Sequence, residues 1–145
     1  KCEVSDFDKH DYRRTGGVTS MIDWTKVITT EDKFQKAKED KKASIAQARY
    51  EAEIAGATIN GVLIRTDRET QAVLTSACLQ AYIDSGYSLN WKTGDGTFVS
   101  LPAEQIMAFG TAVRAHVQAC FDHEAELIPL IEAATTQAEL DSINW

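Results

Sequence analysis

The first 29 residues lack the regular spacing of apolar side chains that marks a helix or a strand. Residues 1–20 are mainly polar and contain the pair Gly16-Gly17, and their apolar positions follow neither a period of 2 nor one of 3.6. We therefore predict an extended polar arm over residues 1–29.

A long charged helix is predicted to follow over residues 30–55. Thr30 offers an N-cap oxygen, and the two acidic residues after it put negative charge at the positive end of the helix. No glycine or proline interrupts the stretch before Gly56, but residues 33–44 are nearly all charged. The first half of this helix therefore has almost no face to bury. We expect it to be solvated or held by a partner, which makes it a docking helix.

The second half of this helix carries a modest apolar stripe. Ile45, Tyr50 and Ile54, with several alanines, lie on one side, where they can dock on the residues that follow. A heptad register counted from Phe34 places Lys41 at a core position, so we expect only weak self-association through this helix.

Turn and cap signals divide residues 56–145 into hairpins and helices. Asn60-Gly61, between two short apolar runs, is typical of a type I′ hairpin. Thr66 and Glu69 are spaced as a capping box, which predicts a helix that ends at Gly86. Its expected buried stripe consists of Leu74, Ala77, Cys78, Ala81 and Tyr82.

A second hairpin and the main core helix come next. Apolar and polar residues alternate over 87–92, and a second strand follows the glycine-rich turn at residues 94–96. Pro102 then suits the first turn of a helix, which Pro129 should bend or end. The expected core arc of this helix consists of Ile106, Phe109, Val113, Val117, Cys120, Phe121 and Ile128.

Together these elements predict an α+β fold with a compact domain over residues 56–145. A last short helix should begin at the capping box of Thr136 and Glu139. Because a hairpin alone is marginally stable, we expect the two hairpins to pair into one small antiparallel sheet packed on the helices. The predicted order is a long N-terminal helix, then hairpin, helix, hairpin, helix and short helix.

Composition places the chain among soluble globular proteins. It has 145 residues, of which 43% are hydrophobic and 26% charged, which fits one ordinary domain. No apolar run approaches the roughly 20 residues of a membrane span, and no secretory leader is visible. Three scattered cysteines do not make a disulfide framework, so a reducing compartment is expected.

Charge is distributed unevenly along the chain. Residues 1–50 hold 11 basic and 9 acidic side chains, whereas residues 51–145 hold 4 and 13. A surface this acidic repels phosphate backbones, and no basic stripe with interleaved aromatics is present. We therefore expect no nucleic-acid binding.

The most metal-like group in the sequence is His116, Cys120 and His123. Their spacing places them within roughly 60° of arc on one helix, at 100° per residue. One helix cannot close a tetrahedral site, and Cys78 is expected in another helix's core, so the simpler interpretation is a buried cysteine flanked by two histidines. The three residues remain a weak candidate for a metal site, and we predict no cofactor.

Other catalytic patterns are missing. The sequence has no phosphate-binding glycine motif, and a Cys120 nucleophile would point along the same helix as its histidines instead of meeting them across a cleft. Glu124 projects into the apolar arc, where a carboxylate is costly unless it is paired. We predict that the protein is not an enzyme.

Apolar side chains near the charged helix are the expected partner-binding residues. Trp24 stands in a polar segment with no core of its own to fill, because the arm has no apolar pattern. The full set assigned to partner binding is Trp24, Val27, Phe34 and Tyr50.

Three segments together resemble a known family. They are residues 61–68, residues 90–99 with Asn90-Trp91-Lys92, and residues 115–121 continuing to Asn144-Trp145. The chain resembles, over about residues 49–145, a domain of unknown function found mostly in tailed bacteriophages and prophages, near the C terminus of tail-fibre and tail-fibre-assembly-like proteins. The family offers no catalytic residue to carry over.

The resemblance implies a structural role in a virion. We expect an adaptor or accessory subunit of a phage tail, which docks on other tail proteins through its N-terminal arm and helix and forms a homo-oligomer there. A host-surface glycan is a candidate ligand of the exposed domain, and no membrane insertion is expected. The expected location is the virion tail, with the host cytoplasm during assembly. The alternatives are a tail-fibre assembly chaperone and a small metal-dependent enzyme using His116, Cys120 and His123.

Overall fold

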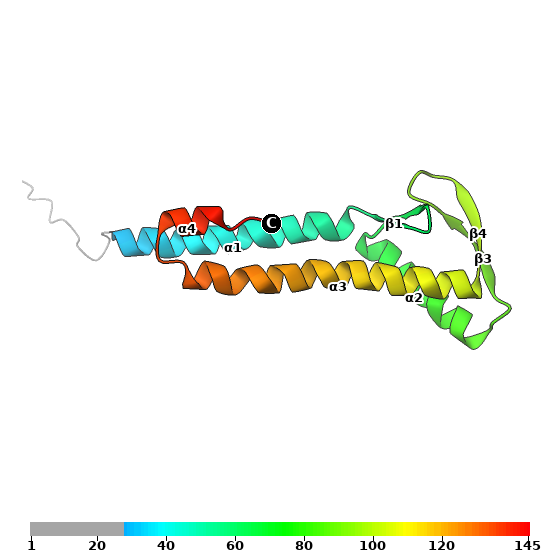
Figure 1. Cartoon of the computed structure of the whole chain (residues 1–145). Helices are drawn as coiled ribbons and strands as arrows, with labels where there is room; N and C mark the ends of the chain where they lie inside the picture. Colours follow the sequence, from blue (N-terminus) through cyan, green and yellow to red (C-terminus); the bar gives the residue numbers. More distant parts are fainter. Residues whose placement is uncertain (1–27) are drawn as a thin grey trace, which may run out of the picture.

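The computed structural model describes residues 28–145, which form a helical stem and a smaller head at one end of it (Figure 1). The stem consists of α1 (Thr30–Ile54), the second half of α3 (Ala103–Ala133) and α4 (Gln137–Ser142). The head consists of the first half of α3, helix α2 (Arg68–Ile83), and the hairpins β1–β2 (Ala57–Ile59, Val62–Ile64) and β3–β4 (Ser88–Lys92, Phe98–Pro102). The predicted α+β class and the order of elements are confirmed. No described helix is long and apolar enough to cross a membrane.

The N-cap of helix α1 lies one residue earlier than predicted, although the helix begins at Thr30 as expected. Thr29, and not Thr30, is the N-cap: its hydroxyl accepts the Asp32 N–H at 3.0 Å, and the Asp32 carboxylate accepts the Thr29 N–H at 2.8 Å. This reciprocal capping box satisfies two backbone donors at once. The sequence offers Thr29 and Thr30 as caps, and Thr29 is the one placed three residues before a carboxylate.

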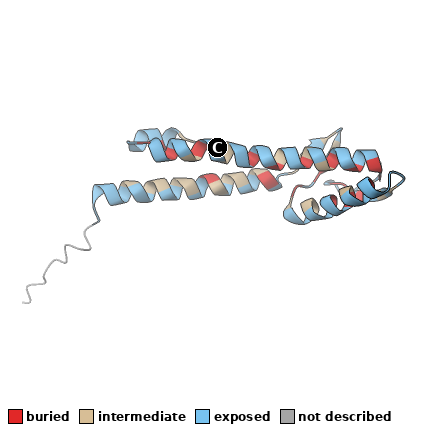
Figure 2. Ribbon diagram, turned by 90° about the horizontal axis from the view of Figure 1, so that it is seen from below, coloured by how far each residue is buried: buried red, intermediate tan, exposed pale blue. Residues whose placement is uncertain are grey.

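The first half of α1 does have a face to bury, because the chain itself supplies the partner. Helices α1 and α3 run antiparallel side by side, and α4 lies against the beginning of α1 (Figures 1 and 2). Ile45 is the buried apolar residue of α1, and Phe34 and Ala37 pack against the same cluster. The remaining members of this stem cluster are Leu127, Ile131, Ala134 and Leu140.

Lysines of α1 complete the contact with α3. The ammonium of Lys38 donates to the Glu132 carbonyl at 2.9 Å, and that of Lys42 donates to the Glu132 carboxylate at 2.9 Å. Their aliphatic stems can cover apolar surface while the charged ends stay wet. A segment that looks fully solvated in the sequence is therefore half of a helix pair.

Thr66 joins the stem to the head and does not cap α2. The side chain is fully buried, and its hydroxyl donates to the Glu53 carbonyl at 2.5 Å and accepts the Gly56 N–H at 2.9 Å. The cap of α2 is Asp67, whose carboxylate accepts the Thr70 N–H at 2.9 Å. The predicted capping box is therefore wrong, because the hydroxyl of Thr66 is used to bind the end of α1.

The hairpins form two separate two-stranded sheets and do not pair into the single sheet predicted. Asn60 (φ 53°) and Gly61 (φ 79°) confirm the type I′ turn of β1–β2. The sheets meet where the Gly94 N–H donates to the Leu63 carbonyl at 2.7 Å. A Cβ on Gly94 would lie 2.7 Å from Leu63 Cγ, so only glycine allows this approach. Because β1 and β2 have three residues each, they offer little edge for further pairing.

Helix α2 turns a narrower face to the core than predicted. Leu74, Ala77 and Ala81 are buried, but Tyr82 is 80% exposed. The helix ends at Ile83, with Asp84 in an extended conformation, so the predicted helix end at Gly86 is also wrong. The buried residues of the head core are Ile64, Leu74, Ala77, Ala81, Trp91, Leu101, Ala103, Ile106, Phe109, Val113 and Val117.

Helix α3 runs through Pro129 to Ala133 and links head and stem. Proline removes only the bond to the carbonyl four residues earlier, and both Pro129 and Ala125 lie on the exposed side of the helix. Leu127 and Ile131, on the opposite side, are buried in the stem cluster, and their packing keeps this part of the helix against the stem. Phe121, expected in the core arc, is partly exposed instead.

Candidate functional site

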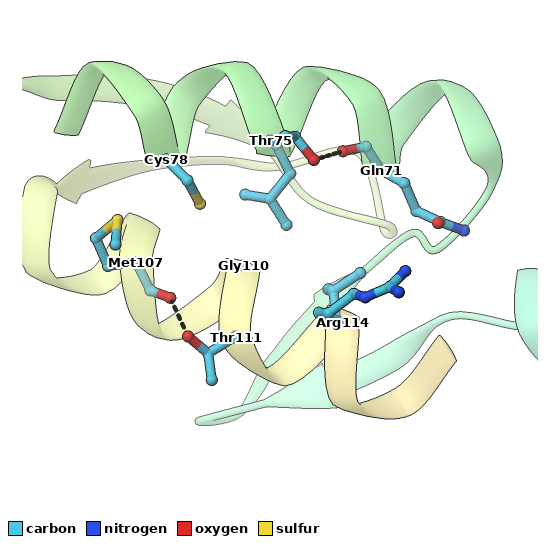
Figure 3. Close-up of a pocket in the computed structure, with 9 residues that line it drawn as sticks. Gln71, Thr75, Cys78, Met107, Gly110, Thr111 and Arg114 are labelled. Carbon is cyan, nitrogen blue, oxygen red and sulfur yellow. Dashed lines mark hydrogen bonds between the residues drawn. The ribbon is translucent and has the colours of Figure 1, made fainter. Parts of the chain in front are cut away.

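A groove of about 480 Å³ lies between α2 and α3 on the outside of the head. The two helices run antiparallel here, so Gln71 lies opposite Arg114 at one end and Cys78 opposite Met107 at the other (Figure 3). The remaining lining residues are Leu74, Thr75, Gly110, Thr111 and Val113. Both helices are held from behind by the head core, so the groove is part of the fixed structure.

Gly110 sets the depth of the groove. A Cβ at this position would overlap the Sγ of Cys78, so glycine lets the two helices approach closely. The Cys78 thiol then donates to the Ile106 carbonyl across 3.4 Å. Because Gly110 has no side chain to fill the space above this contact, a groove remains between the two helices.

The two threonines of the groove donate their hydroxyl protons to backbone carbonyls of their own helices. Thr75 Oγ1 donates to the Gln71 carbonyl at 2.8 Å, and Thr111 Oγ1 donates to the Met107 carbonyl at 3.0 Å (Figure 3). Such bonds to the preceding turn remove the donor from the groove. The middle of the groove therefore offers mainly apolar contacts, and Arg114 and Gln71 provide polar groups at one end.

The cysteine of the groove is in a poor setting for nucleophilic chemistry. Burial raises the pKa of the Cys78 thiol, so the thiol is protonated at neutral pH. The thiol donates its proton to the Ile106 carbonyl, which is too weak a base to remove it. The groove is suited to holding apolar side chains.

A second group of polar residues lies where stem and head meet. Glu53 is nearly fully buried, with a side-chain exposure of 3%, and pairs with the guanidinium of Arg49. Arg49 Nε also donates to the Glu124 carboxylate at 3.0 Å, which supplies the partner that Glu124 requires in its apolar surroundings. The guanidinium lies over the ring of Phe121, 4.4 Å from its centroid. We call Arg49, Glu53 and Glu124 the junction cluster, and its compact pairing indicates a structural role.

The three metal candidates of the sequence point to different neighbours. His116 Nε2 donates to the Ala52 carbonyl at 3.1 Å, and Cys120 is buried beside the junction cluster, where burial and the charge of Glu53 raise the pKa of its thiol. The ring of His123 packs against Trp145 with 4.7 Å between centroids. Within residues 28–145 no three His, Cys, Asp or Glu side chains are grouped to hold a metal ion.

The predicted partner-binding residues have separate positions. Trp24 and Val27 lie outside the described residues. Phe34 packs on the stem cluster, with the Lys38 ammonium 5.0 Å from its ring centroid. Tyr50 is exposed on α1. The structure therefore uses Phe34 in part for the interior of the stem and leaves Tyr50 on the surface.

The sequence analysis missed the groove residues on α3. Met107, Thr111 and Arg114 recur every four and three residues, which is the spacing of one helix face. That face could have been noticed as a second, exposed stripe beside the core arc. Which residues of α2 lie opposite could not be known before the two helices were placed.

A family model matches most of the chain. The model described as "Domain of unknown function (DUF4376)" matches residues 36–144, which is more than half of the chain. No curated protein and no solved structure is similar enough to count as a match.

Proposed function

Because the chain belongs to the DUF4376 family of domains of unknown function, which names no reaction, we propose from its architecture and its sequence resemblance that it is a structural adaptor of a bacteriophage tail. In this proposal the N-terminal segment and the beginning of α1 attach to other tail proteins, and the head projects away from that attachment. The protein acts during assembly in the host cytoplasm and then stays in the virion.

The observation that supports the proposal best is that the start of α1 and the head lie at opposite ends of the molecule. The described residues begin at the end of the stem where α4 packs on α1. The head lies at the opposite end of α3 (Figure 1). At about 1.5 Å per residue, the 31 residues of α3 span roughly 46 Å, the first half within the head and the second half along the stem. A rigid helical spacer between an attachment end and a compact head has the geometry that an adaptor requires.

The attachment end has features that fit a protein partner. Ile28, immediately before α1, is a large hydrophobic residue that is mostly exposed. Nearby, Lys33 and Lys36 lie between two acidic pairs, Glu31-Asp32 and Glu39-Asp40, so the surface has no large charge of one sign. The exposed apolar side chain of Ile28 is the feature that fits a protein contact, because the centres of interfaces are richer in apolar than in charged residues.

Mass spectrometry of purified particles tests the proposal. If the chain is a tail subunit, it is present in a fixed, small number of copies relative to the major tail proteins. Deleting residues 1–28, which keeps the Thr29 cap of α1, should remove it from particles while the remaining chain stays folded. Abundance in infected cells together with absence from finished particles would contradict the proposal and support an assembly chaperone.

A further inference from the structure

Two rows of side chains run along the outer face of the α2–α3 groove. The row on α2 consists of Gln71, Thr75, Cys78 and Tyr82, and the row on α3 consists of Glu104, Met107, Thr111 and Arg114. Spacings of three and four residues place each row on one helix face. Because the helices are antiparallel, Gln71 and Arg114 share one end of the groove (Figure 3). The helical order places Tyr82 one turn beyond Cys78 and Glu104 one turn beyond Met107, toward the other end. We call these eight residues the α2–α3 strip.

The two ends of the strip carry opposite charges, and its middle is apolar. Arg114 is one of only four basic residues in the range 51–145, and Glu104 lies ten residues earlier on the same helix, about 15 Å away at 1.5 Å per residue. Both residues are exposed, and among residues 28–145 neither has an ion-pair partner. Between them the strip offers Cys78, Met107 and threonines whose hydroxyl protons are already bonded to their helices.

Exposed apolar side chains widen the strip along α2. Leu79 is 62% exposed and Ile83 is 69% exposed, beside the largely exposed Tyr82. A contiguous apolar surface bordered by polar residues marks an interaction site more often than isolated exposed side chains do. Something with a complementary apolar surface is therefore expected to cover it.

We propose that the strip is the surface through which two copies of this chain pair, related by a twofold axis. A twofold axis through the middle of the strip reverses its direction in the second copy. Each Arg114 then meets the Glu104 of the other copy, and the apolar middles face each other. A strip with one positive and one negative end and an apolar centre is complementary to its own reversed copy, which would not be true if both ends had the same charge.

The twofold arrangement also places the cysteines. Cys78 lies next to the middle of the strip, so the axis brings the two Cys78 side chains close together. The other described cysteine, Cys120, is buried near the stem and away from the groove. The inference does not depend on where the protein is located in a virion, so it survives failure of the proposed function.

Sedimentation equilibrium of the full chain over a range of concentrations up to about 1 mM tests the pairing. The wild type should show a reversible monomer–dimer equilibrium. R114E puts two acidic residues opposite each other twice, and should raise the dimer dissociation constant about tenfold or more. E104R should do the same. The double variant E104R/R114E restores both pairs with their signs exchanged and should return the constant to within about threefold of wild type.

K92E is the matched control, because it makes the same charge change on β3 outside the strip and should leave the dissociation constant unchanged. Circular dichroism of every variant checks that the helices are retained. A monomeric wild type at all concentrations overturns the proposal, as does a dimer whose R114E defect the double variant does not repair. A monomer that binds another protein through Arg114 also overturns it.

Cross-linking gives a second measurement that needs no charge variant. In a C2S/C78S background, which leaves the buried Cys120, a cysteine at the exposed Thr75 (T75C), also next to the middle of the strip, should let a short bismaleimide join two chains. C2S/C78S should remain uncross-linked. A cross-link that persists in this second variant would contradict the twofold arrangement.

Discussion

At the scale of single residues, one hydroxyl connects the two parts of the molecule. Thr66 comes after β2, yet it binds the Glu53 carbonyl at the end of α1 and the Gly56 N–H just beyond it. Both backbone groups lie where the helix has ended and no helical partner remains for them. The hydroxyl therefore replaces the hydrogen bonds that these two groups would make in a continued helix.

Replacing Thr66 by valine should lower the free energy of unfolding by about 1–3 kcal/mol, because it keeps the volume but leaves a buried carbonyl and an N–H without partners. Urea denaturation followed by circular dichroism measures the change. T66S keeps the hydroxyl and should lose less. Equal losses for the two variants would mean that packing of the methyl group, and not the hydrogen bonds, stabilises the junction.

Gly110 is the residue that sets the approach of α2 to α3. G110A should lower the free energy of unfolding by about 1–3 kcal/mol, because its methyl group overlaps the Cys78 sulfur. C78A removes that sulfur, so the double variant G110A/C78A should be more stable than G110A alone. Additive losses in a thermodynamic cycle would contradict the assigned contact.

At the scale of elements, side-chain carboxylates accept backbone N–H groups at the N-termini of helices. The Glu139 carboxylate accepts the N–H groups of Thr135 at 2.7 Å and of Thr136 at 3.1 Å, and the Thr136 hydroxyl accepts the Glu139 N–H in return. This confirms the capping box predicted for the last helix. Helix α4 has six residues, so it depends on this cap and on the burial of Leu140 in the stem cluster.

The cap of α4 should show in an acid titration. Hydrogen bonds from Thr135 and Thr136 hold the pKa of Glu139 below its usual value. A group whose pKa is lower in the folded state stabilises that state above its unfolded pKa, and this stabilisation is lost as the pH falls through the folded pKa. Carbon-detected NMR should therefore find Glu139 titrating below the usual range of a glutamate carboxyl, and α4 signals should broaden in the same acidic range. A Glu139 midpoint at or above that of an uncapped glutamate would contradict the cap.

At the scale of the whole molecule, the junction cluster connects helices that are distant in the sequence. Arg49 and Glu53 come from α1, Glu124 comes from α3, and Gln71 of α2 donates to Glu53 at 3.3 Å. Taking one partner out of a buried ion pair leaves an uncompensated charge, which costs more than the pair contributes. The cluster therefore fixes how the stem meets the head.

R49M should lower the free energy of unfolding by about 3–5 kcal/mol, because Glu124 loses its cation and the buried Glu53 keeps only the exposed Arg68, 3.7 Å away. The triple variant R49M/E53Q/E124Q removes the charges as well and should recover part of the loss. Chemical denaturation measures both, with K36M as the control, since Lys36 forms only an exposed pair with Asp40. A loss below about 1 kcal/mol for R49M would mean that the cluster is not needed for the junction.

The sequence by itself determined the elements of this protein. Local signals suffice where the cause lies within a few residues: the Asn60-Gly61 turn, the Thr136 and Glu139 cap, and the apolar spacing of α3 are all found in the structure. Turn and cap preferences act through neighbouring backbone atoms, so they can be read along the chain. The charged helix was located correctly for the same reason.

Only the tertiary structure decided what these elements do for one another. The lysine-rich half of α1 gained a partner in α3 and α4, Thr66 became a buried link instead of a cap, and the hairpins stayed apart. The groove between α2 and α3 likewise requires Cys78 and Gly110 to be in contact, although they are 32 positions apart in the sequence. Burial and pairing depend on which surfaces meet across long chain separations, and the spacing of residues within one element carries no record of that choice.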